Sequence, residues 1–388
     1  MATPSYYAYP GKRVPAEKPS FTVATLRAAI PKHCWERSAL RSFAYLAVDL
    51  VLIAALYYAS TFIDSAPVPT WVKWGVLWPA YWFWQGAVAT GVWVIAHECG
   101  HQAFSESQAI NDAVGLVLHS CLLVPYYSWK HSHRRHHSNT GNLAKDEVFV
   151  PPAREEVADP EAFDVNQLAI VRLAKIVTSL TIGWPLYLLF NVSGRPYERF
   201  ANHFDPWSPI FNKSERVEIV ISDIALAAVV YGLAQLGNAY GWGWLFCIYG
   251  VPQMIANGWL VLITLLQHTH PALPHYDDKE WDWLRGALAT VDRNYGILTH
   301  FHHRIADTHV CHHLFSTIPH YNAVEATEAI KPVLGEYYLY DDRFLPKALW
   351  QDWRSSLYVA PDKGANPGVK WYHPTEADLQ TKKAKKAA

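Results

Sequence analysis

The sequence predicts an all-α integral membrane protein in which four transmembrane helices carry a histidine-rich cap on the cytosolic side. Three observations lead to this fold class. Hydrophobic residues make up 51% of the 388 residues and charged residues only 17%, against about 25% charged in an ordinary soluble domain. The apolar residues are gathered into four long stretches, and short clusters of histidine lie outside them. The net charge of −1 argues against a nucleic-acid-binding protein, which needs a basic surface.

Each of the four apolar stretches is long enough to cross a bilayer, because about 20 helical residues span roughly 30 Å, the thickness of the hydrocarbon core. The predicted spans are residues 43–63, 74–96, 219–236 and 242–266. The first contains one charged residue, Asp49, the third contains Asp223, and the other two contain none. Aromatic residues such as Trp71 and Tyr240 stand near the span ends, as is typical of residues at a membrane interface.

Two shorter stretches allow more than one interpretation. Residues 113–127 are uncharged but contain His119, and residues 176–192 are uncharged but are interrupted by Gly183 and Pro185. Each is compatible with a re-entrant or interfacial helix as well as with a span.

The distribution of lysine and arginine predicts the orientation in the membrane. The first 42 residues carry seven of them, whereas the two short turns at 64–73 and 236–241 carry only Lys73. The positive-inside rule therefore places the N-terminal segment, residues 1–42, in the cytosol. We expect a single domain over residues 43–372 and a polar tail over residues 373–388, with both termini cytosolic.

The clustered histidines recur at spacings that place them on one face of a helix. The first cluster is a pair four residues apart, directly after the second predicted span, and two later clusters share the order His-x-x-His-His. An even number of spans separates the clusters, so a single site on one side of the membrane can recruit all of them. The candidate ligands are His97 and His101, then His133, His136 and His137, then His268 or His270, and finally His309, His312 and His313.

This set of imidazoles predicts a site with two metal ions. Imidazole binds Zn, Cu, Fe and Ni, but eight or nine ligands are too many for one ion, and a structural zinc site normally uses four ligands, often with cysteine. The five cysteines are scattered without a ligand or disulfide pattern. Two iron ions held by histidine suit redox chemistry with O₂, which zinc cannot perform. The position just outside the bilayer suggests an apolar substrate.

Carboxylates near the clusters are candidates to accept hydrogen bonds from the ligand rings, although ordinary solvated or salt-bridged carboxylates are the alternative. These carboxylates are Glu98, Asp146, Glu147 and Asp307. Most histidines outside the clusters are expected to be ordinary core or surface residues. They are His33, His119, His131, His203, His275, His300, His302, His320 and His373.

Longer motifs around these residues resemble those of the membrane-bound fatty acid desaturases, and more narrowly the plant-type microsomal Δ12 (oleate) desaturases. The resemblance extends from about residue 18 to residue 372. The motifs that carry it are residues 29–42, AHECGH at 96–101, HRRHHSNTG at 133–141, NVSGRPY at 191–197, LQHTHP at 266–271, EWDWLRG at 280–286 and DTHVCHHLFST at 307–317.

The resemblance implies a catalytic cap with a non-haem di-iron centre, whose three histidine boxes correspond to the three clusters. A further ligand after the last span falls on His268 or His270, of which His268 lies closer to the helix end. His303, six residues before His309, is the better match to a single histidine that the family has there, so His270 and His303 are additional ligand candidates.

The resemblance also implies O₂-dependent removal of two hydrogens from an unactivated acyl chain. Such a reaction needs a metal cofactor, because no side-chain acid or base can break so strong a C–H bond. The implied substrate is oleoyl on phosphatidylcholine, which becomes linoleoyl. Electrons would come from cytochrome b5 and its NADH-dependent reductase, as separate proteins, because no His-Pro-Gly-Gly haem-binding motif occurs. The implied compartment is the endoplasmic reticulum membrane. Lys385 and Lys386 stand where a dilysine retrieval signal would, although a solubilising basic tail is the alternative.

Two other functions compete with this interpretation. Fatty acid hydroxylases, epoxygenases and ω-3 (Δ15) desaturases share the same scaffold and boxes. A histidine-rich metal transporter belongs to another class, and it would need ionisable residues along its spans, which here offer only Asp49 and Asp223. Consumption of O₂ and altered lipids would separate an oxygenase from a transporter.

Overall fold

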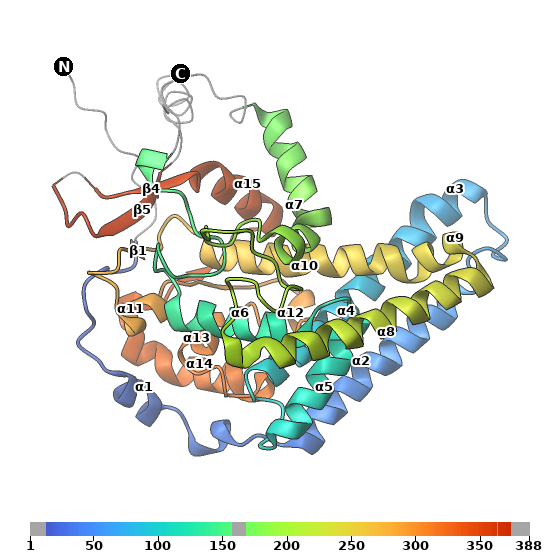
Figure 1. Ribbon diagram of the computed structural model, residues 1–388, viewed down its shortest axis with the longest axis horizontal. Coiled ribbons are helices and arrows are strands. Elements are labelled where there is room, and N and C mark those ends of the chain that lie inside the picture. The colour runs from blue at the N-terminus through green and yellow to red at the C-terminus, as the bar shows by residue number, and fades with distance from the viewer. Residues whose placement is uncertain (1–12, 157–167, 363, 374–388) are drawn as a thin grey trace.

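The computed structural model describes residues 13–156, 168–362 and 364–373. Helices dominate, and the strands are only two to five residues long. Long helices extend side by side to the end of the molecule that carries α3 (Thr70–Val72) and α9 (Trp242–Leu245), and shorter elements form a cap at the opposite end (Figure 1). The predicted fold class, a helical membrane protein with a histidine-rich cap, is confirmed.

The residues of the four predicted spans all form helices. Residues 43–63 lie mainly in α2 (Ala39–Ser60), which Ser38 caps by accepting a hydrogen bond from the Arg41 amide. Residues 74–96 lie in a π-helical turn, η2 (Lys73–Leu77), and in α4 (Trp78–Gly100). Residues 219–236 lie in α8 (Arg216–Tyr240), which follows the 3₁₀ turn η5 (Lys213–Glu215). Residues 242–266 form α9, the π turn η6 (Phe246–Gly250) and α10 (Val251–His268).

Within the described residues, four helices are long and apolar enough to cross a membrane, but they are not all the predicted ones. They are Ala39–Ser60, Ala169–Phe190, Lys213–Tyr240 and Trp242–His268. Large apolar side chains on three of them, such as Val51, Ile224 and Phe246, are exposed, as lipid-facing residues would be. Helix α4 is not in this set. Its residues 85–99 are buried inside the protein, so much of α4 serves the core and not a lipid-facing surface.

Helix α7 (Ala169–Phe190) contains the ambiguous stretch 176–192 and continues through Pro185 to a left-handed cap at Asn191. In Figure 1 it runs across the direction of α8 and α10. If α7 crossed the membrane in addition to α8 and α10, the first two histidine clusters and the last one would lie on opposite sides. The structure brings these clusters together, so a single extra crossing by α7 is excluded.

The other ambiguous stretch, residues 113–127, is not one helix. It includes the end of α5 (Gln108–Cys121) and the start of α6 (Tyr126–Asn139), and these two helices meet at a bend of 107°. Pro125 stands directly before α6, and proline lacks the amide that would continue the preceding helix. The bend turns α6 and its three candidate ligands toward the cap.

The cap consists of short helices, single turns and two small sheets. Its helices are α1 (Val23–Ala29), α11 (Trp283–Ala287), α12 (Leu298–Phe301), α13 (His309–Leu314), α14 (His320–Leu334) and α15 (Leu345–Ser355), with the 3₁₀ turns η1 (Lys32–Trp35), η3 (Arg154–Glu156) and η7 (Gly335–Tyr337). In one sheet, β5 (Val369–His373) pairs antiparallel with β1 (His275–Tyr276) and β4 (Tyr358–Ala360). In the other, β2 (Asp292–Arg293) pairs parallel with β3 (Tyr340–Asp341).

The main hydrophobic core is centred on α4, which packs against α2, α5 and α10. Two glycines let neighbouring segments approach α4 closely. A Cβ atom on Gly86 would lie 2.5 Å from a side-chain carbon of Ile255 in α10, and one on Gly91 would lie 2.3 Å from the carbonyl oxygen of Phe301 in α12. The core therefore places the C-terminal ends of α4 and α10, which carry histidines, close to each other.

The domain limits at 42 and 372 stay predictions, and Lys385 and Lys386 lie outside the described residues.

Candidate metal centre

The structure brings nine of the clustered histidines together in two adjacent groups. They come from the C-terminal ends of α4 and α10, from α6 and from α13. The five-histidine group consists of His97, His101, His133, His137 and His312. The four-histidine group consists of His136, His268, His309 and His313. The rings of His137 and His313 stack at 4.2 Å between centroids, which joins the two groups.

The five-histidine group offers one ring nitrogen from each residue, and these nitrogens lie within 4.8 Å of one another. His133 Nε2 lies 3.0 Å from His97 Nε2 and 3.1 Å from His137 Nε2. The buried Nε2 atoms of His101 and His312 have no hydrogen-bond partner. Because a buried polar atom without a partner is costly, these nitrogens need something at the centre of the group to bind.

In the four-histidine group, ring nitrogens of His136, His268 and His313 lie within 4.8 Å of one another. His309 completes the group, because its Nε2 lies 3.1 Å from the Nε2 atoms of both His268 and His313. The Nε2 atoms of His136 and His268 are 3.4 Å apart. The α13 helix contributes histidines to both groups, since His312 belongs to the five-histidine group and His309 and His313 belong to the four-histidine group.

These spacings fit metal ions held by imidazole. Two nitrogens at right angles around an ion, each bonded at about 2.0–2.1 Å, lie roughly 3 Å apart. Burial lowers the pKa of His101 to about 3, and burial with neighbouring histidines holds the pKa of His312 and of His313 well below the usual range. These three rings are therefore neutral at physiological pH, which is the form of imidazole that binds metal.

Of the four candidate carboxylates, only Asp146 forms a hydrogen bond with a ring of the two groups. Its Oδ1 lies 2.6 Å from His136 Nδ1, and its Oδ2 accepts a hydrogen bond of 2.9 Å from the Gly141 amide. The carboxylate therefore holds the His136 proton on Nδ1 and leaves Nε2 facing the group.

The other three candidates have different partners. Glu98 accepts a hydrogen bond from the His320 amide, and its second oxygen is 3.6 Å from His97 Nδ1, which is too long for a hydrogen bond. Glu147 accepts hydrogen bonds from Tyr197, and Asp307 accepts one from Arg304. No motif in the sequence predicts these partners.

His270 and His303, the two additional ligand candidates, lie outside both groups. His270 Nδ1 accepts a hydrogen bond from the Ala272 amide, and its Nε2 faces Asp341 at 3.5 Å. His303 Nε2 lies 2.6 Å from Asp49 Oδ2. Among the described residues, none of the nine histidines expected to be ordinary core or surface residues joins either group.

Three further residues support the ligand rings, although their roles were not predicted. The Thr140 hydroxyl donates a hydrogen bond to the His136 carbonyl and lies 3.2 Å from His313 Nδ1, so it can accept the proton of that ring. The indole of Trp129 stacks on His133 at 4.4 Å and that of Trp93 stacks on His97 at 5.6 Å. In the sequence these tryptophans look like ordinary core residues, because only the fold places them against the ligands.

A cavity with a largely apolar lining adjoins the five-histidine group. The space between its walls, part of it open to solvent, is about 750 Å³, and its lining includes His133, Trp93, Trp129, Gly183, Trp184 and Leu260. The walls come from α4, α6, α7 and α10. An apolar molecule in this cavity would lie next to one of the clustered imidazoles.

Comparisons with known proteins agree with this geometry. A family model described as fatty acid desaturase matches residues 73–344, and one described as a domain of unknown function (DUF3474) matches residues 11–58. The chain is 57% identical over 365 residues to the Delta(12)-acyl-lipid-desaturase of Punica granatum, covering 94% of this chain and 93% of the relative.

Two further relatives are similar over the same extent. The omega-6 fatty acid desaturase, endoplasmic reticulum isozyme 2, of Glycine max is 56% identical and covers 94% of each chain. The Delta(12)-fatty-acid desaturase of Arabidopsis thaliana is 54% identical and covers 93% of this chain and 94% of the relative. The family model covers well over half of the chain. The histidine clusters of the chain meet beside an apolar cavity. The chain therefore belongs to the fatty acid desaturase family.

Proposed function

We propose that this protein is an oleate Δ12 desaturase of the endoplasmic reticulum membrane, which converts an oleoyl chain of phosphatidylcholine into linoleoyl. The observation that carries the proposal is the position of His133, which belongs to the five-histidine group and also lines the apolar cavity. The names of the relatives supply the regiochemistry, since those from Punica granatum and Arabidopsis thaliana are called Delta(12) desaturases. The compartment rests on the Glycine max relative, whose name includes the endoplasmic reticulum.

The nine clustered histidines would hold two iron ions, one in the five-histidine group and one in the four-histidine group. When bound, the irons supply the O₂-dependent oxidation that removes two hydrogens from an unactivated chain. Imidazole-rich sites suit iron, and the two groups contain no carboxylate or thiolate ligand among the described residues. Asp146 supports this assignment, because it holds one ligand ring in a fixed tautomer.

The protein's own contribution is to bind and orient the acyl chain. The cavity walls are mainly aromatic and aliphatic, so they favour a hydrocarbon chain over water. Trp93 and Trp129 line the cavity and also stack on His97 and His133. They therefore hold the ligand rings from the side that the substrate would occupy, and they shield that side from solvent. A chain in this cavity would be positioned by its shape and not by hydrogen bonds.

Electrons would reach the site from cytochrome b5 and its NADH-dependent reductase on the cytosolic side. The lysines and arginines of the N-terminal segment support this orientation, because such residues favour the cytosolic side. The metal-transporter alternative has little support, since the nine imidazoles lie in two compact groups and do not line a path along the spans.

The proposal can be tested in a yeast that makes oleate but no linoleate. Fatty-acid methyl esters from cells that express the full chain are separated by gas chromatography and identified by mass spectrometry. A new linoleate peak, lost in a His101→Ala variant and kept in a variant of the exposed His300, supports the proposal. A hydroxy, epoxy or Δ15 product would overturn the Δ12 assignment. If an inserted, iron-loaded chain supplied with cytochrome b5 leaves oleate unchanged, the proposed reaction is wrong.

A further inference from the structure

Two adjacent residues of β2, Asp292 and Arg293, contact two different elements that carry candidate ligands. Both side chains are almost completely buried. Arg293 contacts the end of α10, which carries His268, and Asp292 contacts the start of α13, which carries His309 and His313. These elements supply three of the four rings in the four-histidine group.

The contacts at α10 satisfy carbonyl groups that a helix end leaves without partners. Arg293 Nε donates a hydrogen bond of 2.9 Å to the carbonyl oxygen of Leu266, two residues before His268. The Thr290 hydroxyl donates one of 3.1 Å to the carbonyl of Gln267. The segment 290–293 therefore holds the last turn of α10, and with it the direction in which His268 leaves the helix.

The contact at α13 is made at its first turn. The amide of Val310 donates a hydrogen bond of 2.8 Å to Asp292 Oδ1, and the second carboxylate oxygen accepts one of 2.8 Å from the Tyr338 hydroxyl. Because α13 is only six residues long, it has few internal hydrogen bonds of its own. Its position relative to α10 depends strongly on contacts of this kind.

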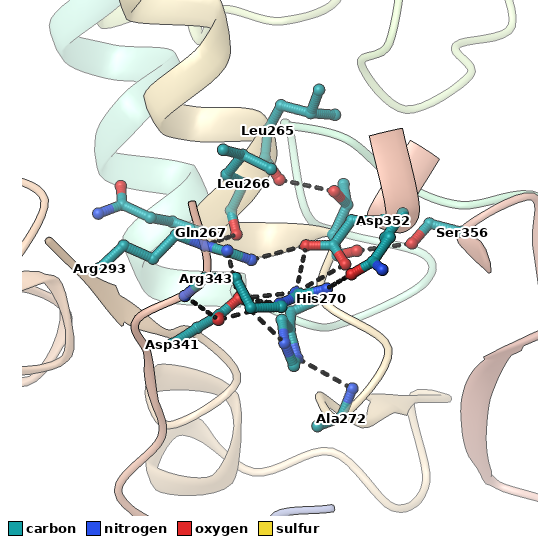
Figure 2. Close-up of polar contacts among 12 residues, drawn as sticks. Leu265, Leu266, Gln267, His270, Ala272, Arg293, Asp341, Arg343, Asp352 and Ser356 are labelled. Atoms are coloured by element: carbon teal, nitrogen blue, oxygen red, sulfur yellow. Dashed lines mark hydrogen bonds and ion pairs between the residues drawn. The ribbon is translucent and has the colours of Figure 1, made fainter. Parts of the chain in front are cut away.

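Arg293 is held in place from the opposite side by two carboxylates. Its guanidinium forms ion pairs with Asp341 of β3 and with Asp352 of α15, and Arg343 pairs with the same two carboxylates. Figure 2 shows these four side chains meeting beside the end of α10. His270, Asp341 and Asp352 have the arrangement of a small metal group, but the two arginines already balance both carboxylates, so this cluster is an anchor for Arg293 and not a metal site.

The geometry points to Asp292 and Arg293 as positioning residues that set the distance between His268 and His309, and so complete the four-histidine group. This inference depends on the proposed function in one respect, which is that the bound metal is iron. The two Nε2 atoms lie 3.1 Å apart, although their residues are 41 positions apart in the chain. Among the described residues, neither side chain makes a contact of this kind with α4 or α6, which supply four of the five rings in the five-histidine group. The pair reaches that group only through His312, because Asp292 contacts α13. Replacing Arg293, whose contact is with α10, should therefore affect the four-histidine group first.

The test compares Arg293→Lys with Arg343→Lys in the full, detergent-purified chain. Lysine keeps the charge but cannot form the planar fork that contacts a carbonyl and two carboxylates together. Arg343 pairs with the same two carboxylates but, among the hydrogen bonds of the described residues, contacts none of the helices that carry the clustered histidines, so it is the matched control. Iron per chain is measured by mass spectrometry, and paramagnetic resonance distinguishes a single ferric ion from a coupled pair.

We expect the wild type and Arg343→Lys to hold about two irons per chain. Arg293→Lys should hold about one iron and give the signal of a single ferric ion. The reason is that losing a contact that supports a ligand typically weakens metal binding about 10- to 100-fold. Thr290→Val, which removes only one hydroxyl, should show a smaller loss in the same direction. Two irons in both Arg293→Lys and Thr290→Val would overturn the inference. So would equal losses in Arg293→Lys and Arg343→Lys, or loss of both irons from Arg293→Lys. A wild type without iron would overturn the proposed function as well.

Discussion

His303 Nε2 lies 2.6 Å from Asp49 Oδ2, and both side chains are buried between α2, α4 and the segment that follows α12. Asp49 is the single charge in the first predicted span, and His303 was a candidate ligand. The structure therefore explains both residues through one contact. Gly91 of α4 makes the contact possible, since a Cβ there would lie 3.3 Å from His303 Nε2 and 3.4 Å from Asp49 Oδ2. The pair attaches the cap to the helix bundle.

Replacing His303 with alanine should destabilise the protein without removing metal. The change leaves a buried Asp49 oxygen without its hydrogen-bond partner, and an unsatisfied buried polar group costs about 1–3 kcal/mol. We expect a lower melting temperature in detergent and an unchanged iron content. His300→Ala is the matched control, because His300 lies in α12 and is exposed. A His303→Ala protein with normal stability and reduced iron would instead make His303 a ligand.

The two histidines after α10 should behave differently when each is replaced with alanine. His268→Ala should remove about one iron per chain, since it takes away a ligand of the four-histidine group. His270→Ala should keep both irons and lower the melting temperature, because His270 packs within the Asp341 and Asp352 cluster. Metal analysis of the two purified variants checks this. Equal iron loss in both variants would contradict the assignment of His268 as a ligand and of His270 as a residue outside the metal groups.

Asp146→Asn should weaken iron binding without preventing folding. Asparagine has the same shape but lacks the charge that makes the His136 ring a stronger ligand, and such changes typically cost about 10- to 100-fold in metal affinity. The measurement is the chelator concentration that removes half of the iron. Asp278→Asn is the control, because Asp278 is half exposed and pairs with Lys145 at the surface. Identical chelator profiles for wild type and Asp146→Asn would refute the role given to this carboxylate.

Gly183→Leu should block the cavity and reduce product while leaving the metal groups intact. A Cβ on Gly183 would meet Val261 and Ser179 at 3.7 Å, so the position tolerates a side chain, and the longer leucine would occupy cavity space. Overfilling a packed site costs about 1–3 kcal/mol. Taken as lost substrate binding, this energy weakens binding by roughly 5- to 160-fold, and linoleate in yeast should fall accordingly. Gly232→Leu on α8 is the control, since nothing lies within 4 Å of a Cβ there. Full linoleate yield from Gly183→Leu would exclude the cavity as the substrate site.

Much of the architecture was predictable from local patterns in the sequence. Long uncharged stretches form helices because no other backbone structure satisfies its own hydrogen bonds in lipid. The His-x-x-His-His spacing places three rings on one helical face, which is why the ligands on α6 and α13 could be named before their positions were known. The second predicted span differs from the other three in its surroundings. Residues 85–99 of α4 are uncharged up to His97 because they form the core, and an apolar sequence does not distinguish burial in protein from burial in lipid.

The sequence by itself determined which residues are clustered imidazoles, because helical periodicity is a local property. Only the tertiary structure decided how they divide into a group of five and a group of four, and that α13 serves both. It also decided that His268 belongs to the four-histidine group while His270, two residues later, faces Asp341. The physical reason is that α10 ends between them, and the direction of each ring then depends on contacts with β2, β3 and α15. Those contacts join residues far apart in the chain, and no local pattern in the sequence encodes them.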